Sequence, residues 1–173
     1  EGRDEALKKY THLVCQLLKM PMSFVSILDD EKQYIKSAQN IAPTDTSLAG
    51  AFCEQTLKQG ETLLCPDTHQ HPIFHRDRAV REAPFIRFYA GCPLKTRDGV
   101  TVGTLSILDT QPRTLSDEQI AIFKTLAELI SDFLASWHSV GYIDVVTLLP
   151  NRQRLLKDIE VSAEGTFRLV IID

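Results

Sequence analysis

The chain lacks the features that mark several large classes of protein. It has no basic excess, since 19 lysines and arginines face 23 aspartates and glutamates, for a net charge of −4. No positive field therefore favours nucleic acid as a partner. No apolar run approaches the roughly 20 residues that cross a bilayer, so we expect no membrane contact and a cytoplasmic location. The 43% hydrophobic and 24% charged residues are typical of a globular protein.

Cysteine is scarce and is not arranged to bind a metal. The four cysteines are Cys15, Cys53, Cys65 and Cys92. None of them forms a Cys-x-x-Cys pair, which argues against a zinc site. They stand in apolar contexts, which predict buried, reduced thiols.

Histidines gather in one polar segment, residues 67–84. His71 and His75 have the spacing of a metal-binding pair on one helical face. Pro72 stands between them and argues against a continuous helix there. Together with His69, they are expected to be solvated side chains on a loop.

The order of predicted elements indicates an α+β domain built on one antiparallel sheet. Apolar residues at helical spacing predict helices, and short β-rich runs between turn residues predict strands. Helices are predicted at 4–20, 49–58 and 116–140, and strands at 22–28, 33–38, 62–65, 86–95 and 100–108. Gly60 is expected to cap a helix, and Gly99 to take a positive φ in a turn between the last two strands.

Several local strings resemble the GAF domain, a small-molecule sensing module. They are Phe52-Cys53-Glu54-Gln55-Thr56, Cys65-Pro66-Asp67, Ile86-Arg87-Phe88-Tyr89-Ala90-Gly91-Cys92-Pro93-Leu94, Gly103-Thr104-Leu105-Ser106-Ile107-Leu108-Asp109 and Pro112-Arg113-Thr114-Leu115. Residues 1–138 are accordingly predicted to form a GAF-like sensor. The resemblance implies a central antiparallel sheet with flanking helices, the last of which connects the sensor to the C-terminal part of the chain.

The same resemblance implies a ligand site between the sheet and the loop 67–84. The candidate pocket residues are Cys53, Asp67, Phe74, Phe85, Tyr89 and Ser106. Strand alternation predicts Phe88 and Ala90 on one face of the sheet, and Arg87 and Tyr89 on the other. Two interpretations stay open: the pocket binds an unknown small molecule, or side chains fill it.

The long helix 116–140 carries two apolar stripes. One has heptad spacing and consists of Ile120, Phe123, Ala127, Ile130, Leu134 and Trp137. The other, predicted to pack on the sheet, consists of Ile122, Leu126, Leu129 and Phe133. A helix that is apolar on two sides needs two partners, so the heptad stripe predicts a homodimer through this helix. The alternative is that both stripes form one wide surface facing the core.

Residues 144–152 resemble the start of another family. The string Asp144-Val-Val-Thr-Leu-Leu-Pro-Asn-Arg152 is similar to Asp-x-Leu-Thr-Gly-Leu-Pro-Asn-Arg, which opens the GGDEF domain of diguanylate cyclases. The chain departs from that pattern at Val146 and Leu148. The resemblance implies a salt bridge between Asp144 and Arg152.

Residues 141–173 are therefore predicted to be the N-terminal fragment of a GGDEF domain, a partial output-domain tail. The resemblance implies that Asp173 would bind Mg²⁺ in an intact domain. The apolar strand 167–172 would have free edges, and we expect it to pair with another chain.

The Gly-Gly-Asp-Glu-Phe signature of that family is absent from this chain. GTP and Mg²⁺ are therefore implied only for a longer parent, which would make cyclic di-GMP from two GTP molecules. No cofactor is expected in this chain, and no cyclase activity. The first hypothesis is a bacterial signalling protein whose GAF sensor regulates a diguanylate cyclase through dimer geometry.

Two other hypotheses compete with it. One is a non-catalytic GAF module, for ligand binding or dimerisation, attached to a degenerate GGDEF domain. The other is a free methionine sulfoxide reductase, an enzyme of the same fold. That activity needs a specific set of reactive cysteines, and the cysteine positions here do not resemble that set.

Overall fold

The computed structural model describes residues 2–29, 32–41 and 50–142. The chain divides into two compact units, Glu1–Phe133 and Leu134–Asp173, and the first contains the sheet and the site. Of the second unit, only residues 134–142 are described, as the end of a helix. The predicted boundary between residues 138 and 141 stays a prediction, and Asp144, Arg152, Asp173 and the strand 167–172 lie outside the described residues.

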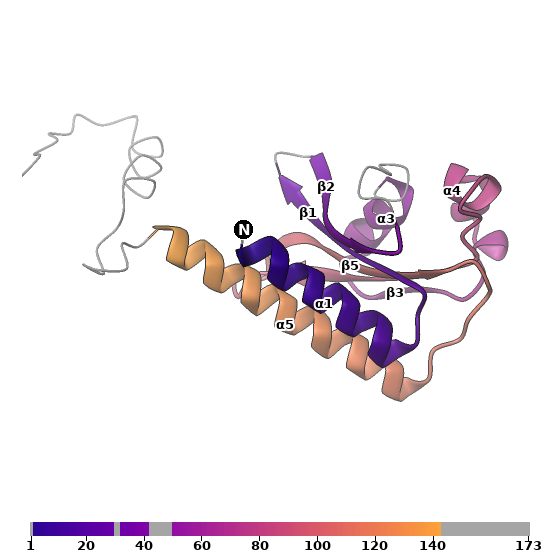
Figure 1. Cartoon of the computed structure of the whole chain (residues 1–173). Helices are drawn as coiled ribbons and strands as arrows, with labels where there is room; N and C mark the ends of the chain where they lie inside the picture. Colours follow the sequence, from indigo (N-terminus) through magenta and orange to yellow (C-terminus); the bar gives the residue numbers. More distant parts are fainter. Residues whose placement is uncertain (1, 30–31, 42–49, 143–173) are drawn as a thin grey trace, which may run out of the picture. The chain divides into compact units, whose positions relative to one another are not determined.

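A five-stranded antiparallel sheet forms the centre of the first unit, as the sequence predicts (Figure 1). The strands are β1 (Met22–Asp29), β2 (Lys32–Gln39), β3 (Leu63–Cys65), β4 (Phe88–Lys95) and β5 (Thr101–Asp109). Their order is β2-β1-β5-β4-β3. Because β1 pairs with β5 in the middle, the early and late parts of the domain must meet before the sheet is complete.

Helices cover both faces of this sheet. They are α1 (Gly2–Leu18), α3 (Ala51–Gln59), the short 3-10 helices η1 (Thr68–Gln70) and η2 (Phe74–Arg76), α4 (Arg78–Arg81) and α5 (Asp117–Tyr142). In Figure 1, α1 and α5 lie side by side along one face, and α3 and α4 lie on the other. The fold is therefore a sheet between two unlike helical layers.

Local sequence signals set where the helices begin and end. The backbone N–H of Gln119 donates to Ser116 Oγ, and the Gln119 side chain accepts from the backbone N–H of Ser116. This reciprocal pair is a capping box, and it starts α5. Gly60 ends α3 in the left-handed conformation at φ 69°, which glycine adopts without steric cost. Gly99 has φ 80° in the turn before β5, as predicted.

The two faces of the sheet bury separate sets of side chains. One cluster contains Met22, Phe24, Phe52, Cys53, Leu63, Cys65, Phe74, Ala79, Val80, Ile86, Tyr89 and Leu108. Phe88 and Ala90 are also buried but do not belong to that cluster, because strand alternation turns them to the α1 and α5 layer. Burying each large apolar side chain contributes roughly 2 kcal/mol.

The long helix corrects one prediction. The heptad residues Phe123, Ala127 and Ile130 are buried within this chain, so they cannot supply the dimer contact assigned to them. Leu129, from the stripe predicted to pack on the sheet, is 49% exposed. Heptad spacing marks any core-facing stripe of a helix, so periodicity alone does not say which partner covers it. Leu126 is buried too, which fits the wide core-facing surface.

The remaining three residues of the heptad stripe are less informative. Ile120 is half-buried, Leu134 lies in the second unit, and the side chain of Trp137 lies outside the described residues. Within the residues that the structure describes, no helix is long and apolar enough to cross a membrane.

Candidate functional site

The segment between β3 and β4 covers the sheet face opposite α1 and α5. We call residues 67–87 the cap; it contains η1, η2 and α4 (Figure 1). Asp67 caps η1 by accepting from the backbone N–H of His69, and Asp77 caps α4 by accepting from that of Ala79. Short polar side chains at these positions explain why the segment breaks into brief turns.

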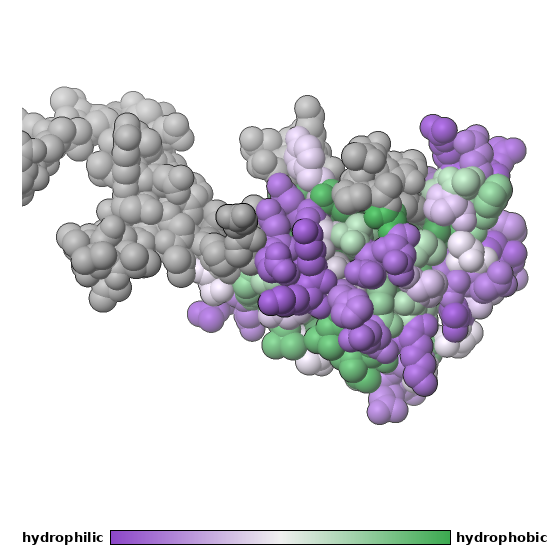
Figure 2. All heavy atoms as spheres, in the orientation of Figure 1, coloured by the Kyte–Doolittle hydropathy of each residue, from purple (hydrophilic) through white to green (hydrophobic). Residues whose placement is uncertain are grey.

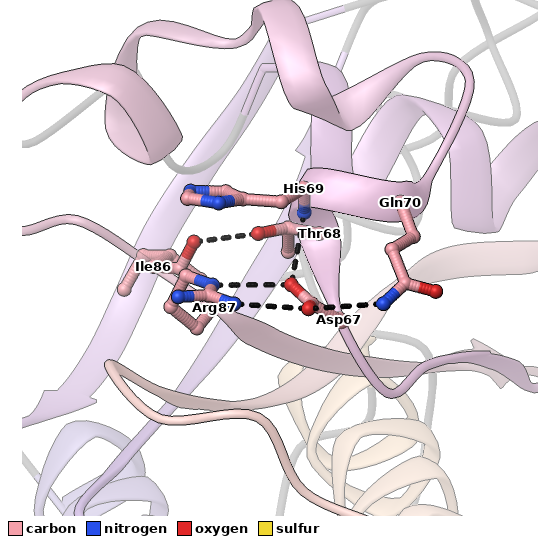
Figure 3. Close-up of polar contacts among 6 residues, drawn as sticks. All are labelled: Asp67, Thr68, His69, Gln70, Ile86 and Arg87. Atoms are coloured by element: carbon pink, nitrogen blue, oxygen red, sulfur yellow. Dashed lines mark hydrogen bonds and ion pairs between the residues drawn. The ribbon is translucent and has the colours of Figure 1, made fainter.

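The two ends of the cap are held together by an ion pair (Figure 3). Arg87 donates from Nε to Asp67 Oδ1 at 3.1 Å and from Nη2 to Oδ2 at 2.9 Å. Beside it, Thr68 Oγ1 donates to the carbonyl of Ile86 at 2.7 Å, and the Thr68 N–H donates to the carbonyl of Arg87 at 2.8 Å. The hydrogen bond from Arg87 lowers the pKa of Asp67, so the carboxylate stays charged near neutral pH.

Aromatic rings fill the space under the cap. Phe74 enters from η2, and its ring centroid lies 4.5 Å from that of Phe52 and 5.7 Å from that of Tyr89. The rings of Phe52 and Tyr89 are 4.8 Å apart. His71 stacks on Phe74 with the centroids 4.1 Å apart. Phe52, Phe74 and Tyr89 are fully buried, so these rings connect the cap to α3 and β4.

A buried polar network lies beneath these rings, formed by Ser26, Cys53, Thr56, Tyr89, Thr104 and Ser106. The Tyr89 hydroxyl lies 2.7 Å from Thr56 Oγ1 and 3.3 Å from Ser106 Oγ. Thr104 Oγ1 donates to Cys53 Sγ at 3.2 Å. Gly91 leaves the room for this arrangement, since a Cβ there would overlap the Tyr89 hydroxyl and Thr56.

The buried polar network is neutral and fully bonded. Burial raises the pKa of the Cys53 thiol and the pKa of the Tyr89 hydroxyl, so neither group ionises near neutral pH. Among the described residues, every buried side-chain nitrogen and oxygen has a hydrogen-bond partner. A protonated thiol is a poor nucleophile, so the arrangement can present hydroxyls to a ligand but is not set up for covalent chemistry.

The structure brings four of the six predicted pocket residues together. Cys53, Tyr89 and Ser106 belong to the buried polar network, and Phe74 lies directly above it. Asp67 lies instead at the base of the cap, and Phe85 is 57% exposed on its outer side. The rings fill the space under the cap, which supports the interpretation of a filled pocket.

Sequence reasoning missed three members of the network, Ser26, Thr56 and Thr104. Each is a hydroxyl residue at a position that strand or helix periodicity turns toward the core. A hydroxyl residue in such a position was the available sequence signal for a buried hydrogen-bond network, since buried hydroxyls need partners. The partners themselves come from three strands and a helix, which no local pattern brings together.

The cysteines and histidines are only partly as predicted. All four cysteines are free thiols; Cys53, Cys65 and Cys92 are buried, whereas Cys15 is half-buried. His69 is exposed as expected, but the solvated state predicted for His71 is wrong because its ring packs on Phe74. Among the described residues, no group of three or more His, Cys, Asp or Glu side chains could hold a metal ion.

Comparison with known proteins identifies the fold. A family model described as GAF domain matches residues 2–133. The GAF domain of a phosphoenolpyruvate-protein phosphotransferase from Coxiella burnetii superposes with a TM-score of 0.68 at 19% identity, covering 80% of this chain and 86% of that one. The type II free methionine-R-sulfoxide reductase of Thermoplasma acidophilum gives 0.61 at 16%, covering 78% and 96%. At these identities both likenesses concern the fold alone.

One curated relative matches along nearly the whole chain. It is the cyclic di-GMP phosphodiesterase PA2567 of Pseudomonas aeruginosa, 29% identical over 173 residues. The alignment covers 99% of this chain but 30% of that protein. The chain therefore spans less than a third of the relative's length, and the match includes residues beyond the family model.

His71 predicts a pH dependence of stability. Its Nδ1 accepts the backbone N–H groups of Ile73 and Phe74 at 3.3 Å each, which needs an unprotonated nitrogen. Burial, followed by the charge of His75, lowers the pKa of His71. Its stabilising contribution is thus complete above the unfolded-state pKa of about 6.5 and is lost as the pH falls below that value toward the lower folded pKa.

Urea unfolding between about pH 7.5 and 5 should show a shallower loss of unfolding free energy in His71→Gln than in the wild type. The exposed His12 on α1 provides the matched control, His12→Gln. An unchanged slope in His71→Gln, or an equal flattening in both variants, would contradict the role given to His71.

Proposed function

The chain belongs to the GAF domain family, and we propose that it is the sensory domain of a longer protein that controls the level of cyclic di-GMP. The relative named as a cyclic di-GMP phosphodiesterase supports this, because its match covers 99% of the chain. The string 144–152, which resembles the start of a GGDEF domain, supports the same signalling system independently.

The named relative and the string 144–152 favour opposite reactions. The relative's name favours hydrolysis of cyclic di-GMP, and residues 141–173 fall largely within its alignment. The string 144–152 favours synthesis, but Leu148 replaces the glycine of the family pattern there. We therefore propose hydrolysis in the longer protein, with this segment in a degenerate GGDEF domain, and keep synthesis as the second candidate.

The observation that carries the sensory role is the buried polar network under the cap. Hydroxyls of Tyr89, Thr56 and Ser106 meet in the middle of a largely apolar cluster. A small ligand that displaced Phe74 would meet these hydroxyls and could exchange its own hydrogen bonds for those they now make to one another, as in a pocket with a few convergent polar groups. Such a displacement would also separate the cap from α3 and β4, because Phe74 packs on Phe52 and Tyr89.

Dimerisation is proposed through a surface different from the heptad stripe. On α1, Leu13 and Leu17 are 39% and 49% exposed, and on α5 Leu129 is 49% exposed. The rings of Tyr10 and Phe133 lie 5.5 Å apart and join the two helices next to these leucines. Figure 2 shows a patch of hydrophobic residues over part of this helical layer, bordered by hydrophilic ones. Such a surface fits a second copy of itself in a symmetric contact.

The proposed turnover activity is tested on the full-length protein. With Mg²⁺, it should hydrolyse cyclic di-GMP, and deletion of residues 2–133 should change that rate by roughly threefold or more, an effect of the size of ordinary allosteric couplings. Formation of cyclic di-GMP from GTP would support the second candidate instead. The 173-residue chain alone should make none from GTP, since it lacks the signature. If the folded full-length protein catalysed neither the hydrolysis nor the synthesis of cyclic di-GMP, the proposal would be contradicted.

The dimer is tested on the chain itself by sedimentation. Leu17→Glu combined with Leu129→Glu should give monomers, because four charges, two from each copy, would be desolvated in the symmetric contact. Val100→Glu changes a side chain that is 60% exposed in a turn and serves as the control that stays dimeric. A monomeric wild type, or a double variant that still dimerises, would refute this surface.

A further inference from the structure

A depression lies at the surface of the cap, and no residue of the buried polar network lines it. It is open to solvent, has a volume of about 610 Å³ and is lined by His69, His75, Val80, Arg81, Phe85, Arg87 and Thr110. Its size is that of a small-molecule site. Of these residues, only Phe85 was among the predicted pocket residues, and Phe74 does not line the depression.

Phe85 is held in an unusual conformation at this depression. Its φ is +59°, which a bulky residue adopts only when the surrounding structure enforces it. The Phe85 N–H donates to the carbonyl of Glu82 at 2.7 Å, and the next N–H, that of Ile86, donates to the carbonyl of Ala79 at 2.8 Å. These bonds fix the backbone, and the ring remains 57% exposed.

The charged side chains that line the depression are basic, although one of them, Arg87, is already paired with the Asp67 carboxylate outside the lining. Arg81 is exposed, and its guanidinium has no hydrogen-bond or ion-pair partner among the described residues. Arg87 uses Nε and Nη2 on Asp67 and retains further N–H donors. The ring of His69 extends to the same side of the cap as Arg87 in Figure 3. Within the described part of the chain, no carboxylate lines the depression, although the chain as a whole has a net charge of −4.

We infer that this depression binds a small organic anion built on a planar ring, with the ring against Phe85 and the acid group at Arg81 and Arg87. A guanidinium matches a carboxylate or phosphate in geometry as well as in charge. An exposed aromatic ring provides a stacking surface for a flat ligand. Aromatic carboxylates and nucleotides share this chemistry, and the experiment separates them.

Occupancy of this site would act on the cap. Arg87 and His69 belong to its base, whereas Arg81 and Phe85 belong to its last helix and the turn after it. A ligand that contacts both parts would tie them together. This inference does not depend on the proposed activity of the longer protein, because binding is measured on the chain itself.

Calorimetric titration of the 173-residue chain tests the inference with four probes. Benzoate and guanosine monophosphate each combine a ring with an anion, guanosine has the ring alone, and inorganic phosphate has the charge alone. At least one of the first two should bind with a Kd of about 1 mM or tighter. Guanosine and phosphate should bind at least about tenfold more weakly. Whichever of benzoate and guanosine monophosphate binds identifies the ligand class.

Two variants locate the bound probe. Phe85→Gly removes the ring and suits the positive φ, so the fold should be retained while binding weakens by about tenfold or more. Arg81→Gln should weaken it similarly, and Arg97→Gln, at an exposed arginine outside the depression, should not. Failure of both ring-bearing anions to bind, equal binding of phosphate, or binding that survives Phe85→Gly and Arg81→Gln would each overturn the inference.

Discussion

The ion pair between Asp67 and Arg87 is the contact on which the cap side of the structure depends. β3 and β4 pair antiparallel with Cys65 opposite Tyr89, so the intervening chain must leave the sheet and return to the same place. The pair joins the two ends of this excursion with two charge-assisted hydrogen bonds, which are stronger than neutral ones. With the ends joined, η2 can seat Phe74 over the buried polar network.

The two covers of the sheet differ in a way that suits a sensor. On one face, the long helices α1 and α5 bury a continuous apolar surface that includes Leu7, Val14 and Phe123. On the other, the cap consists of helical turns of three or four residues joined by short loops. Elements of low local stability are the ones that open and respond to ligands. We propose that the cap is the layer that responds to a ligand, and α5 leads from the opposite layer toward the C-terminal residues.

Much of the architecture could be predicted because local signals determine it. Ser116, Gly60 and Gly99 mark boundaries through their own hydrogen bonding or backbone freedom, and each is where the sequence predicts it. The exposed face of α5 could not be predicted, because spacing does not reveal which partner covers a stripe. The exposed position of the Phe85 side chain could not be predicted from the sequence either. Its positive φ depends on hydrogen bonds to residues around it.

Hydrogen–deuterium exchange in the chain carrying Asp67→Asn tests most directly whether the cap is a separate unit closed by its ion pair. We expect the amides of Thr68 and Ile86, which bond within the cap and its base, to exchange about tenfold faster or more, the factor that corresponds to ~1.4 kcal/mol. Amides of β1 such as that of Val25 should keep their wild-type rates. Uniform acceleration throughout the sheet, or no change in the cap, would contradict this account.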